Sequence, residues 1–235
     1  RSAARAIQLE AVTVQGGQCL SADRLRDDPE LAALWDEIGK GVETRRAFER
    51  QYRYTRVMRQ EIHTRWRFRS STRRVQTDTA VNEPDSVAVR EARRRASAYA
   101  EAETIRLPDE KELLDPEFLR GHCLDPAFDE SEGVYVIRFR PVRPRRGGVD
   151  IGGAVHVDAG TYLIRRLEFE YLAGTRVHAQ SWVQYGDVAV AGGTLRLPVH
   201  GQASLRPRGV GAAIAVEATS TLTVRYEGFQ PAGPE

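Results

Sequence analysis

The stretch GAVHVDAGTYLIRRLEFEY, residues 153 to 171, decides the fold of this 235-residue chain. Apolar and polar residues alternate on both sides of an Asp-Ala-Gly-Thr segment at 158–161, whose residues suit a tight turn. The alternating apolar residues are Val155 and Val157 before the turn, then Leu163, Leu167, Phe169 and Tyr171. Alternation with a period of two is typical of strands with one buried face. Because so short a turn joins antiparallel neighbours, the stretch predicts an antiparallel hairpin.

The same pattern continues on both sides of this hairpin, from Gly133 to Tyr226. Tyr135, Ile137 and Phe139 alternate upstream, and period-two segments follow downstream at 177–185, 195–205 and 214–226. Glycine-containing turns separate these segments, at 145–148, 173–175, 191–193 and 208–209. The region therefore predicts an antiparallel meander of about six strands, which its own twist bends into a curved sheet.

A helix is predicted ahead of the sheet, from about Pro29 to Phe48. Asp28-Pro29-Glu30 suits a helix start, because aspartate caps free amides and proline fits the first helical position. Apolar residues then recur at helical spacing, at Leu31, Leu34, Trp35, Ile38 and Val42. We expect this stripe to pack on the concave face of the sheet. The predicted fold class is α+β, mainly β, with a curved antiparallel meander sheet, or half-barrel, packed on an N-terminal amphipathic helix.

The segment between this helix and the meander begins with another period-two pattern. Apolar residues occupy mainly even positions, at Tyr52, Tyr54, Met58, Ile62, Trp66 and Phe68, and arginines mainly odd ones. This pattern predicts a long strand with one buried face, followed by an edge strand or a hairpin. Residues 86–99 fit either an exposed helix or a loop, and 109–114 and 115–120 fit two short helical turns.

The domain organisation follows from these segments. We expect residues 1–18 to be a linker, or a strand arriving from a preceding domain. Residues 19–228 then form a single domain of curved sheet plus helix, and residues 229–235 a tail. The chain starts at Arg1 without a methionine or the apolar core of a signal peptide, which is typical of part of a longer protein.

Charge and apolar content exclude several classes of protein. The net charge of +2 is too low for a histone-like nucleic-acid binder, and no apolar run is long enough to cross a bilayer. Residues 45–74 are rich in arginine and 101–132 in acids. These are either solvated faces near one another or, for the arginines, a patch for an anionic partner. The alternation puts aromatics and arginines of the long strand on opposite faces, which argues against a nucleic-acid stacking platform.

Catalytic and metal-binding motifs are weak throughout the chain. The five histidines are scattered singly, at His63, His122, His156, His178 and His200. His156 and Asp158 could form a metal or acid–base pair, but Asp158 also opens the turn of the hairpin, and we favour the turn role. Nucleophile elbows, phosphate-binding loops and dinucleotide-binding glycine patterns are missing from the sequence. We expect neither an enzyme, nor a cofactor, nor a metal.

The two cysteines, Cys19 and Cys123, have no CxxC neighbour. An even pair suggests one long-range disulfide in an extracytoplasmic protein, whereas a cytosolic protein would keep two buried free thiols. Their spacing leaves both alternatives open.

Several segments resemble the C-terminal region of secreted bacterial proteins, of the kind found in Gemmatimonadota, that carry a carboxypeptidase-regulatory-like domain. They are Cys19, then Leu34 to Lys40, Tyr52 to Tyr54, Phe118 to Cys123, Phe139 to Val142, Gly153 to Asp158 and Arg165 to Tyr171. The arrangement from Gly153 to Tyr171 is also more loosely similar to the lipoprotein-carrier (LolA/LolB-like) fold. The first resemblance implies a periplasmic or extracellular domain associated with the outer membrane, and with that location we expect the Cys19–Cys123 disulfide.

Three functions are compatible with these features. We favour a non-enzymatic envelope domain that binds a hydrophobic or extended ligand, or a partner protein of the envelope, in the hollow of its sheet. A structural module of a larger outer-membrane-associated protein, with the hollow plugged by the helix, is the first alternative, and a hydrolase is the second. The expected ligand-binding residues are amphipathic aromatics near the hollow. They are Tyr52, Tyr54, Trp66, Phe68 and Trp182.

Overall fold

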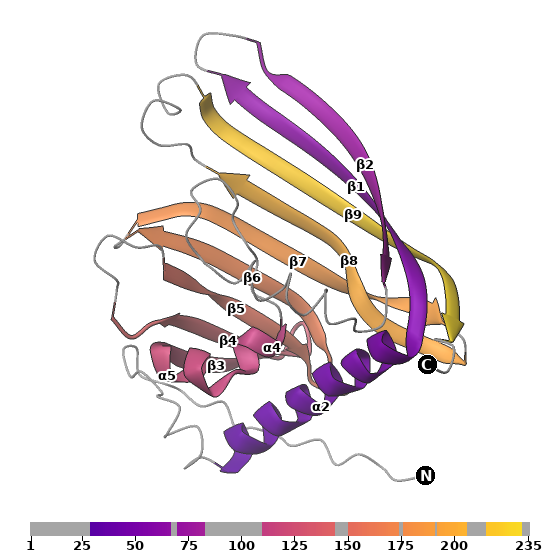
Figure 1. Cartoon of the computed structure of the whole chain (residues 1–235). Helices are drawn as coiled ribbons and strands as arrows, with labels where there is room; N and C mark the ends of the chain where they lie inside the picture. The colour runs from indigo at the N-terminus through magenta and orange to yellow at the C-terminus, as the bar shows by residue number, and fades with distance from the viewer. Residues whose placement is uncertain are drawn as a thin grey trace.

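A computed structural model describes residues 29–66, 70–82, 110–143, 150–173, 176–190, 192–205 and 215–231. They form one curved antiparallel sheet with three helices (Figure 1). The helices are α2 (Pro29–Gln51), α4 (Glu110–Leu114) and α5 (Pro116–Gly121). The strands are β1 (Tyr52–Trp66), β2 (Thr72–Asn82), β3 (His122–Asp129), β4 (Val134–Pro141), β5 (Asp150–Asp158), β6 (Ile164–Ala173), β7 (Arg176–Val190), β8 (Gly193–Leu205) and β9 (Ala215–Pro231).

The sheet has nine strands in the order β2-β1-β9-β8-β7-β6-β5-β4-β3. From β3 to β9 each strand pairs with the next one in sequence, which confirms the predicted meander. The sheet is larger than predicted for two reasons. Asp125 and Pro126 disrupt the alternation of β3, so this strand escapes a pattern search. The pairing of β1 with β9 joins the two ends of the described chain, and no local pattern encodes it.

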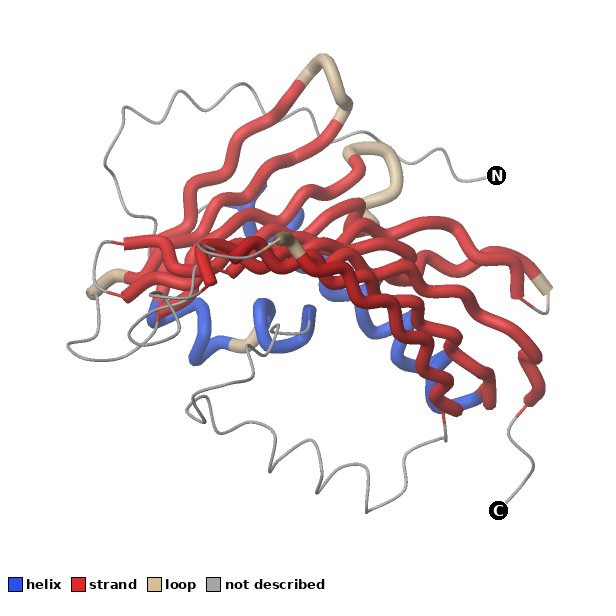
Figure 2. The backbone as a smooth tube through the Cα atoms, turned by 90° about the horizontal axis from the view of Figure 1, so that it is seen from above, coloured by secondary structure: helices blue, strands red, loops and turns tan. Residues whose placement is uncertain are grey.

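Helix α2 packs in the concave side of the sheet, as its apolar stripe predicts (Figure 2). Leu34 is 2% and Ile38 1% exposed, and they join one core cluster with residues of β3 to β7. Trp35 differs from the prediction, because it is only partly buried at the border of this core. Gly41 allows the close approach of α2 to the sheet, since a Cβ there would lie 3.0 Å from Leu163 Cδ2.

The turn between β5 and β6 gives Asp158 the role that the sequence predicts. Its Oδ1 accepts hydrogen bonds from the backbone N–H groups of Gly160 at 2.9 Å and Thr161 at 2.8 Å. Arg165 Nε donates to Oδ2 at 2.8 Å. Because its oxygens are engaged in closing this turn, Asp158 is a structural residue.

Strand β9 runs to Pro231, so residues 229–231 are part of the sheet, contrary to the predicted tail from 229. The reason is a ring contact between Phe229 and Tyr54, with 5.2 Å between their centroids, which holds the end of β9 against β1. Residues 1–18, the predicted linker, lie outside the described residues.

Among the residues that are described, no helix combines the length and apolarity that a bilayer crossing requires.

Candidate ligand-binding cleft

Tyr52 and Tyr54 lie in a cluster of aromatic rings where α2 meets the sheet. Tyr52 stacks on Phe48 with 4.2 Å between centroids, and Tyr54 lies 5.8 Å from Tyr226 and 5.2 Å from Phe229. Tyr54 is only 2% exposed, and burial raises its pKa to about 12. The cluster therefore works as packing that joins α2, β1 and β9.

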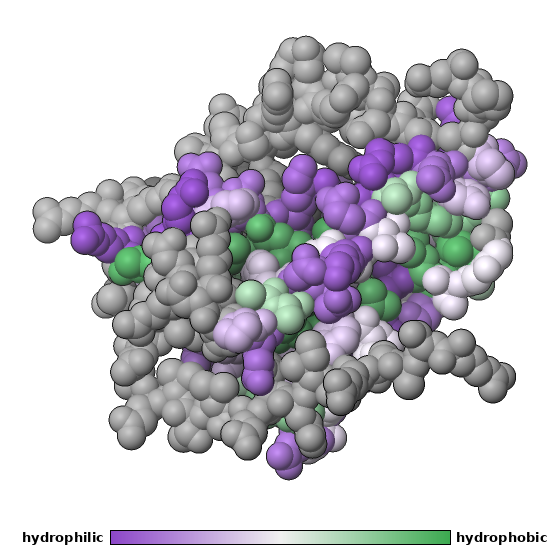
Figure 3. Space-filling model, turned by 90° about the horizontal axis from the view of Figure 1, so that it is seen from below, coloured by the Kyte–Doolittle hydropathy of each residue, from purple (hydrophilic) through white to green (hydrophobic). Residues whose placement is uncertain are grey.

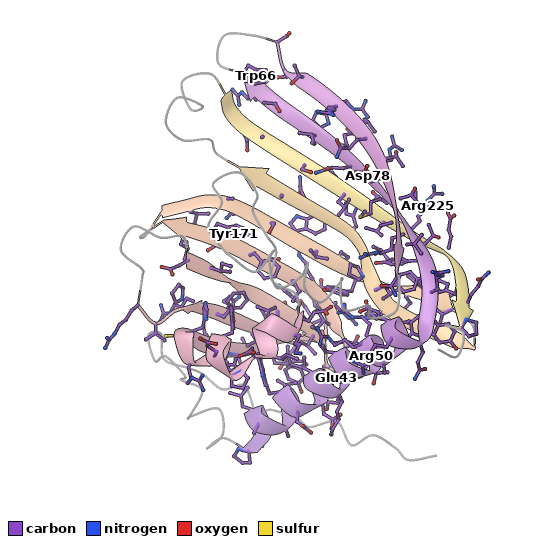
Figure 4. All side chains as sticks on the ribbon, in the orientation of Figure 1. Glu43, Arg50, Trp66, Asp78, Tyr171 and Arg225 are labelled. Carbon is purple, nitrogen blue, oxygen red and sulfur yellow. The ribbon has the colours of Figure 1, made fainter. Side chains whose placement is uncertain are left out.

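Trp66 lies at the opposite end of β1 (Figure 4). Fourteen residue steps separate it from Tyr52, which is roughly 45 Å along an extended strand. Its indole N–H donates to Thr72 Oγ1 at 3.1 Å, across the β1–β2 hairpin. Phe68 lies outside the described residues.

Trp182 lies on the convex face of the sheet, away from the predicted hollow. Its direct partners are Glu168 on β6 and Gln202 on β8, whereas its neighbour Val183 pairs with the buried Leu167. The Arg166 guanidinium lies 4.6 Å from the centre of the Trp182 ring, and the indole N–H donates to Gln202 at 3.1 Å. Directly paired residues share a face, so Trp182 cannot line a space with Tyr54. The prediction of one site formed by all five aromatics is corrected on this point.

The structure instead has a cleft between α2 and the α4–α5 pair, with a volume of about 700 Å³. Thirteen of the described residues line it, and they belong to these helices or to the residue that links α4 and α5. They are Ala32, Trp35, Asp36, Gly39, Lys40, Val42, Glu43, Lys111, Leu114, Asp115, Pro116, Leu119 and Arg120. Figure 3, viewed from the side on which α2 lies, shows apolar surface between hydrophilic side chains.

One face of α2 forms the first wall of the cleft. On α2 the lining positions recur every three to four residues, beside the stripe that packs into the core. The second wall depends on the junction between α4 and α5. Asp115 caps α5, with its Oδ1 accepting the Glu117 N–H at 2.7 Å, and Pro116 occupies the first turn. The cap fixes the direction in which Leu119 and Arg120 project.

A buried polar cluster holds α4 at its distance from α2. Arg45 of α2 forms an ion pair with Glu110 of α4, and the Tyr185 hydroxyl of β7 hydrogen-bonds to both. The side chains of Arg45 and Glu110 are 14% and 4% exposed. Burial raises the pKa of Tyr185 well above its usual value. This one buried contact links the start of the arginine-rich segment to the acidic segment.

The cleft is amphipathic. Trp35, Leu114 and Leu119 supply apolar walls, while both lysines of the chain, Lys40 and Lys111, lie at its border with Arg120. Lys40 Nζ is engaged with Asp36 at 2.8 Å and Glu37 at 2.7 Å. A ligand would therefore meet apolar surface inside and charges of both signs at the rim.

The described residues contain no group of three side chains of metal-ligand type, and the described lining of the cleft holds no histidine, serine or cysteine. His156 lies 3.5 Å from Glu168 on the convex face, and burial lowers its pKa. The ring nitrogens of His122 contact the backbone oxygens of Phe118 and Ile151.

Sequence reasoning missed this cleft because it expected the binding space inside the sheet. One usable signal was the position of Gly39 in the middle of an amphipathic helix. A Cβ at Gly39 would meet nothing within 4 Å, so the glycine leaves open space beside Lys40. A second signal was the position of Trp182, which is three residues from both Ala179 and Tyr185. An odd spacing puts Trp182 on the face of the strand opposite to these two buried residues.

No family model matches the chain, and no curated protein matches it. Among solved structures, the chain is similar to a LolA superfamily protein from Nitrosomonas europaea, at 11% identity and a TM-score of 0.34, over 84% of this chain and 94% of that one. A complex of MucB with MucA matches at 12% identity and a TM-score of 0.22, over 83% of this chain and 93% of that one.

The MucA/MucB complex of Pseudomonas aeruginosa matches at 11% identity and a TM-score of 0.22, over 82% of this chain and 99% of that one. The first of these structures has the fold of the looser resemblance, and none supports the resemblance to carboxypeptidase-regulatory-like proteins. With TM-scores below 0.5, the three likenesses carry no information on ligand or partner.

Proposed function

We propose that this chain is a non-enzymatic binding domain of the cell envelope, which takes an apolar or extended ligand, or a segment of a partner protein, in the cleft between α2 and α4–α5. The observation that carries the proposal is the cleft itself. Its volume of about 700 Å³ lies within the range of about 300 to 1,000 Å³ that is usual for small-molecule sites.

The lining favours an amphipathic ligand. Burial of a chain of methylene groups against Trp35, Leu114 and Leu119 would contribute about 0.8 kcal/mol for each group removed from water. Lys111 and Arg120 at the border could meet polar or anionic atoms that remain near solvent. Trp35 adds an indole N–H that finds no acceptor among the described residues.

The alternative of a structural module with a plugged hollow keeps one observation in its favour. Leu34 and Ile38 are buried against β4 to β7, which supports a hollow that the helix fills there. The cleft lies beside the buried stripe of α2, however, so it is separate from the hollow. The two proposals therefore differ in whether the chain binds a ligand. Periplasmic or extracellular location, and association with the outer membrane, rest on the resemblance and on the predicted disulfide.

The test uses a substitution that fills the cleft. Gly39→Phe places a ring in the cleft, from a position where a Cβ would meet nothing within 4 Å. Gly193→Phe at the start of β8 is the matched control, because Gly193 also has open space and lies outside the cleft. Binding of a dansyl-labelled fatty acid is followed by energy transfer from Trp35, after Trp66 and Trp182 are replaced by phenylalanine.

We expect saturable binding that Gly39→Phe weakens at least about tenfold, equivalent to about 1.4 kcal/mol, while Gly193→Phe leaves the affinity unchanged. Thermal unfolding of each variant checks that the domain stays folded. Saturable binding that is indifferent to Gly39→Phe would place the ligand elsewhere. A lack of binding at every probe concentration would favour the structural module.

A further inference from the structure

The two edges of the nine-stranded sheet differ in their protection against pairing. The β3 edge is eight residues long and carries Pro126 in its middle, which removes a backbone donor. The β2 edge is eleven residues long and contains no proline. In the described part of the chain, no strand lies along the outer side of β2. This edge therefore presents backbone groups that are free to accept another strand.

Two opposite charges stand on β2 at equal distances from Gln76. Arg74 and Asp78 are both exposed, and in the described part of the chain no hydrogen bond or ion pair engages either side chain. Their direct neighbours on β1 are Ile62 and Met58, which offer no charge. Arg73, on the other face, is already bound to Glu61 by two hydrogen bonds of 2.8 Å. Asp78 projects from the outermost strand (Figure 4).

We propose that β2 pairs with β2 of a second copy of this chain, antiparallel and centred on Gln76, so that the two sheets join into one. Antiparallel pairing about a two-fold axis at Gln76 sets Arg74 of each copy opposite Asp78 of the other. Side chains directly opposite one another in such a ladder have Cβ atoms about 5 Å apart, close enough for two symmetric ion pairs.

The charges also select the register. Centring the pair on Thr77 would set Arg74 opposite Ala80, and centring it on Val75 would set Arg74 opposite Gln76. Only the Gln76 register satisfies both charges, and a slip of one residue along either strand loses both ion pairs. Val75, which is 45% exposed, lies next to the two-fold axis and faces Thr77 of the second copy.

A charged residue on an edge strand can also serve to prevent pairing. A strand with Arg74 alone or Asp78 alone would resist pairing, because the charge would face either the same residue of the second copy or a neutral residue. Their symmetric placement about one residue turns the same charges into complementary partners. The second copy is therefore favoured over an unrelated strand, since the edge is complementary to itself.

The test measures the oligomeric state of the full chain by sedimentation equilibrium over a range of protein concentrations. We expect a dimer whose dissociation constant rises at least about tenfold with Arg74→Asp, which sets two carboxylates opposite each other, and similarly with Asp78→Arg. The double variant Arg74→Asp/Asp78→Arg restores the opposite charges, and its dimer should return to within about threefold of the original.

Arg59→Asp is the matched control, because it makes the same charge change at an exposed position of the neighbouring strand β1. It should leave the dimer unchanged. A monomer at every concentration, a dimer indifferent to Arg74→Asp, or a double variant that stays as weak as the single ones would each overturn the proposal. The far-ultraviolet circular dichroism of every variant confirms that the sheet is intact.

Discussion

The sheet is divided between a half that helices cover and a half that they do not. Strands β3 to β7 pack against α2, α4 and α5, and nearly all buried apolar side chains of the described residues belong to this covered half. On β1, β2 and β9, which form the uncovered half, the one buried hydrophobic residue among those described is Tyr54. Both halves are built from antiparallel strand pairs, so burial by helices, not strand pairing, decides where the stability resides.

The largest expected effect concerns the predicted disulfide. Cys123 is buried at the start of β3, in the covered half, and Cys19 lies outside the described residues. A bond between them would close a loop of about a hundred residues, and its loss would cost up to about 4 to 5 kcal/mol by chain entropy. Mass spectrometry of the unreduced protein shows whether the bond is present. Denaturant unfolding before and after reduction measures the free energy that it contributes. Two alkylatable thiols in periplasmically produced protein would contradict the prediction.

The second prediction compares one apolar side chain in each half on the same face. Phe169 is 1% exposed, whereas Ile62 is half-buried. The two residues lie on the same face of the sheet, because a row of directly paired residues runs between them through Ser181, Ala203 and Ser220. Phe169→Ala should cost about 3 to 5 kcal/mol, because it leaves a cavity in the core. Ile62→Ala should cost about 1 kcal/mol, since its side chain already meets solvent. Equal losses in urea unfolding would erase the difference between the halves.

The third prediction compares the two ion pairs. Glu110→Gln leaves Arg45 buried without its main partner and should cost about 3 kcal/mol, near the lower end for buried pairs because Glu49 remains 3.9 Å away. Glu61 accepts two hydrogen bonds from Arg73, which lower its pKa to about 2, but the two side chains are 27% and 58% exposed. Glu61→Gln should therefore leave the unfolding midpoint unchanged at physiological salt. A measurable loss there would show that the uncovered half depends on its surface charges.

The fourth prediction concerns the joint between the halves. Burial raises the pKa of Tyr54 from 10.0 to about 12, with Glu49 acting in the same direction. A phenol with a raised pKa in the folded state contributes stability that is complete below pH 10 and is lost as the pH rises toward 12. Thermal unfolding between pH 9 and 12 should show this loss, and Tyr54→Phe should reduce its slope. An identical slope in the variant would mean that other groups control alkaline unfolding.

The smallest expected effect is a gain. Gly39→Ala adds a methyl group to α2 where nothing lies within 4 Å, and it should stabilise the domain by up to about 1 kcal/mol through helix propensity. Gly41→Ala makes the same change two residues later, but its Cβ would lie 3.0 Å from Leu163 Cδ2. We expect the urea midpoint to rise for Gly39→Ala only. A similar rise for both would mean that α2 is not held close to the Tyr162–Leu163 segment.

Local chemistry made much of the covered half predictable. The turn at Asp158, the α2 stripe apart from Trp35, and the start of α5 at Asp115 each depend on residues close in sequence, and each is found as predicted. The pairing of β1 with β9 depends on segments about 160 residues apart, as the Gln60–Ser220 hydrogen bond of 2.8 Å shows. The alternation of apolar and polar residues within a strand does not identify a partner strand so distant in sequence. The cleft was equally hidden, because it depends on the position of α4, which the Arg45–Glu110 contact sets.

Trp182 shows how a correct strand can still give a wrong site. The predicted strand at 177–185 lies within β7, but the face of each side chain follows from its phase. Val183 is in phase with the core and Trp182 is not. Aromatic side chains of one strand share a site only when they lie on the same face of the sheet.

Hydrogen exchange with mass spectrometry, with and without the dansyl-labelled fatty acid, tests the central claim most directly, because it reports on both halves in one measurement. Without the probe, amides of β4 to β7 should exchange slowest and those of β1 and β9 faster. With the probe, added protection should appear in peptides covering residues 29–43 and 110–120, which line the cleft, and not in β1 or β2. Protection confined to the concave face of β1 and β9, or equal exchange in the two halves, would contradict the account.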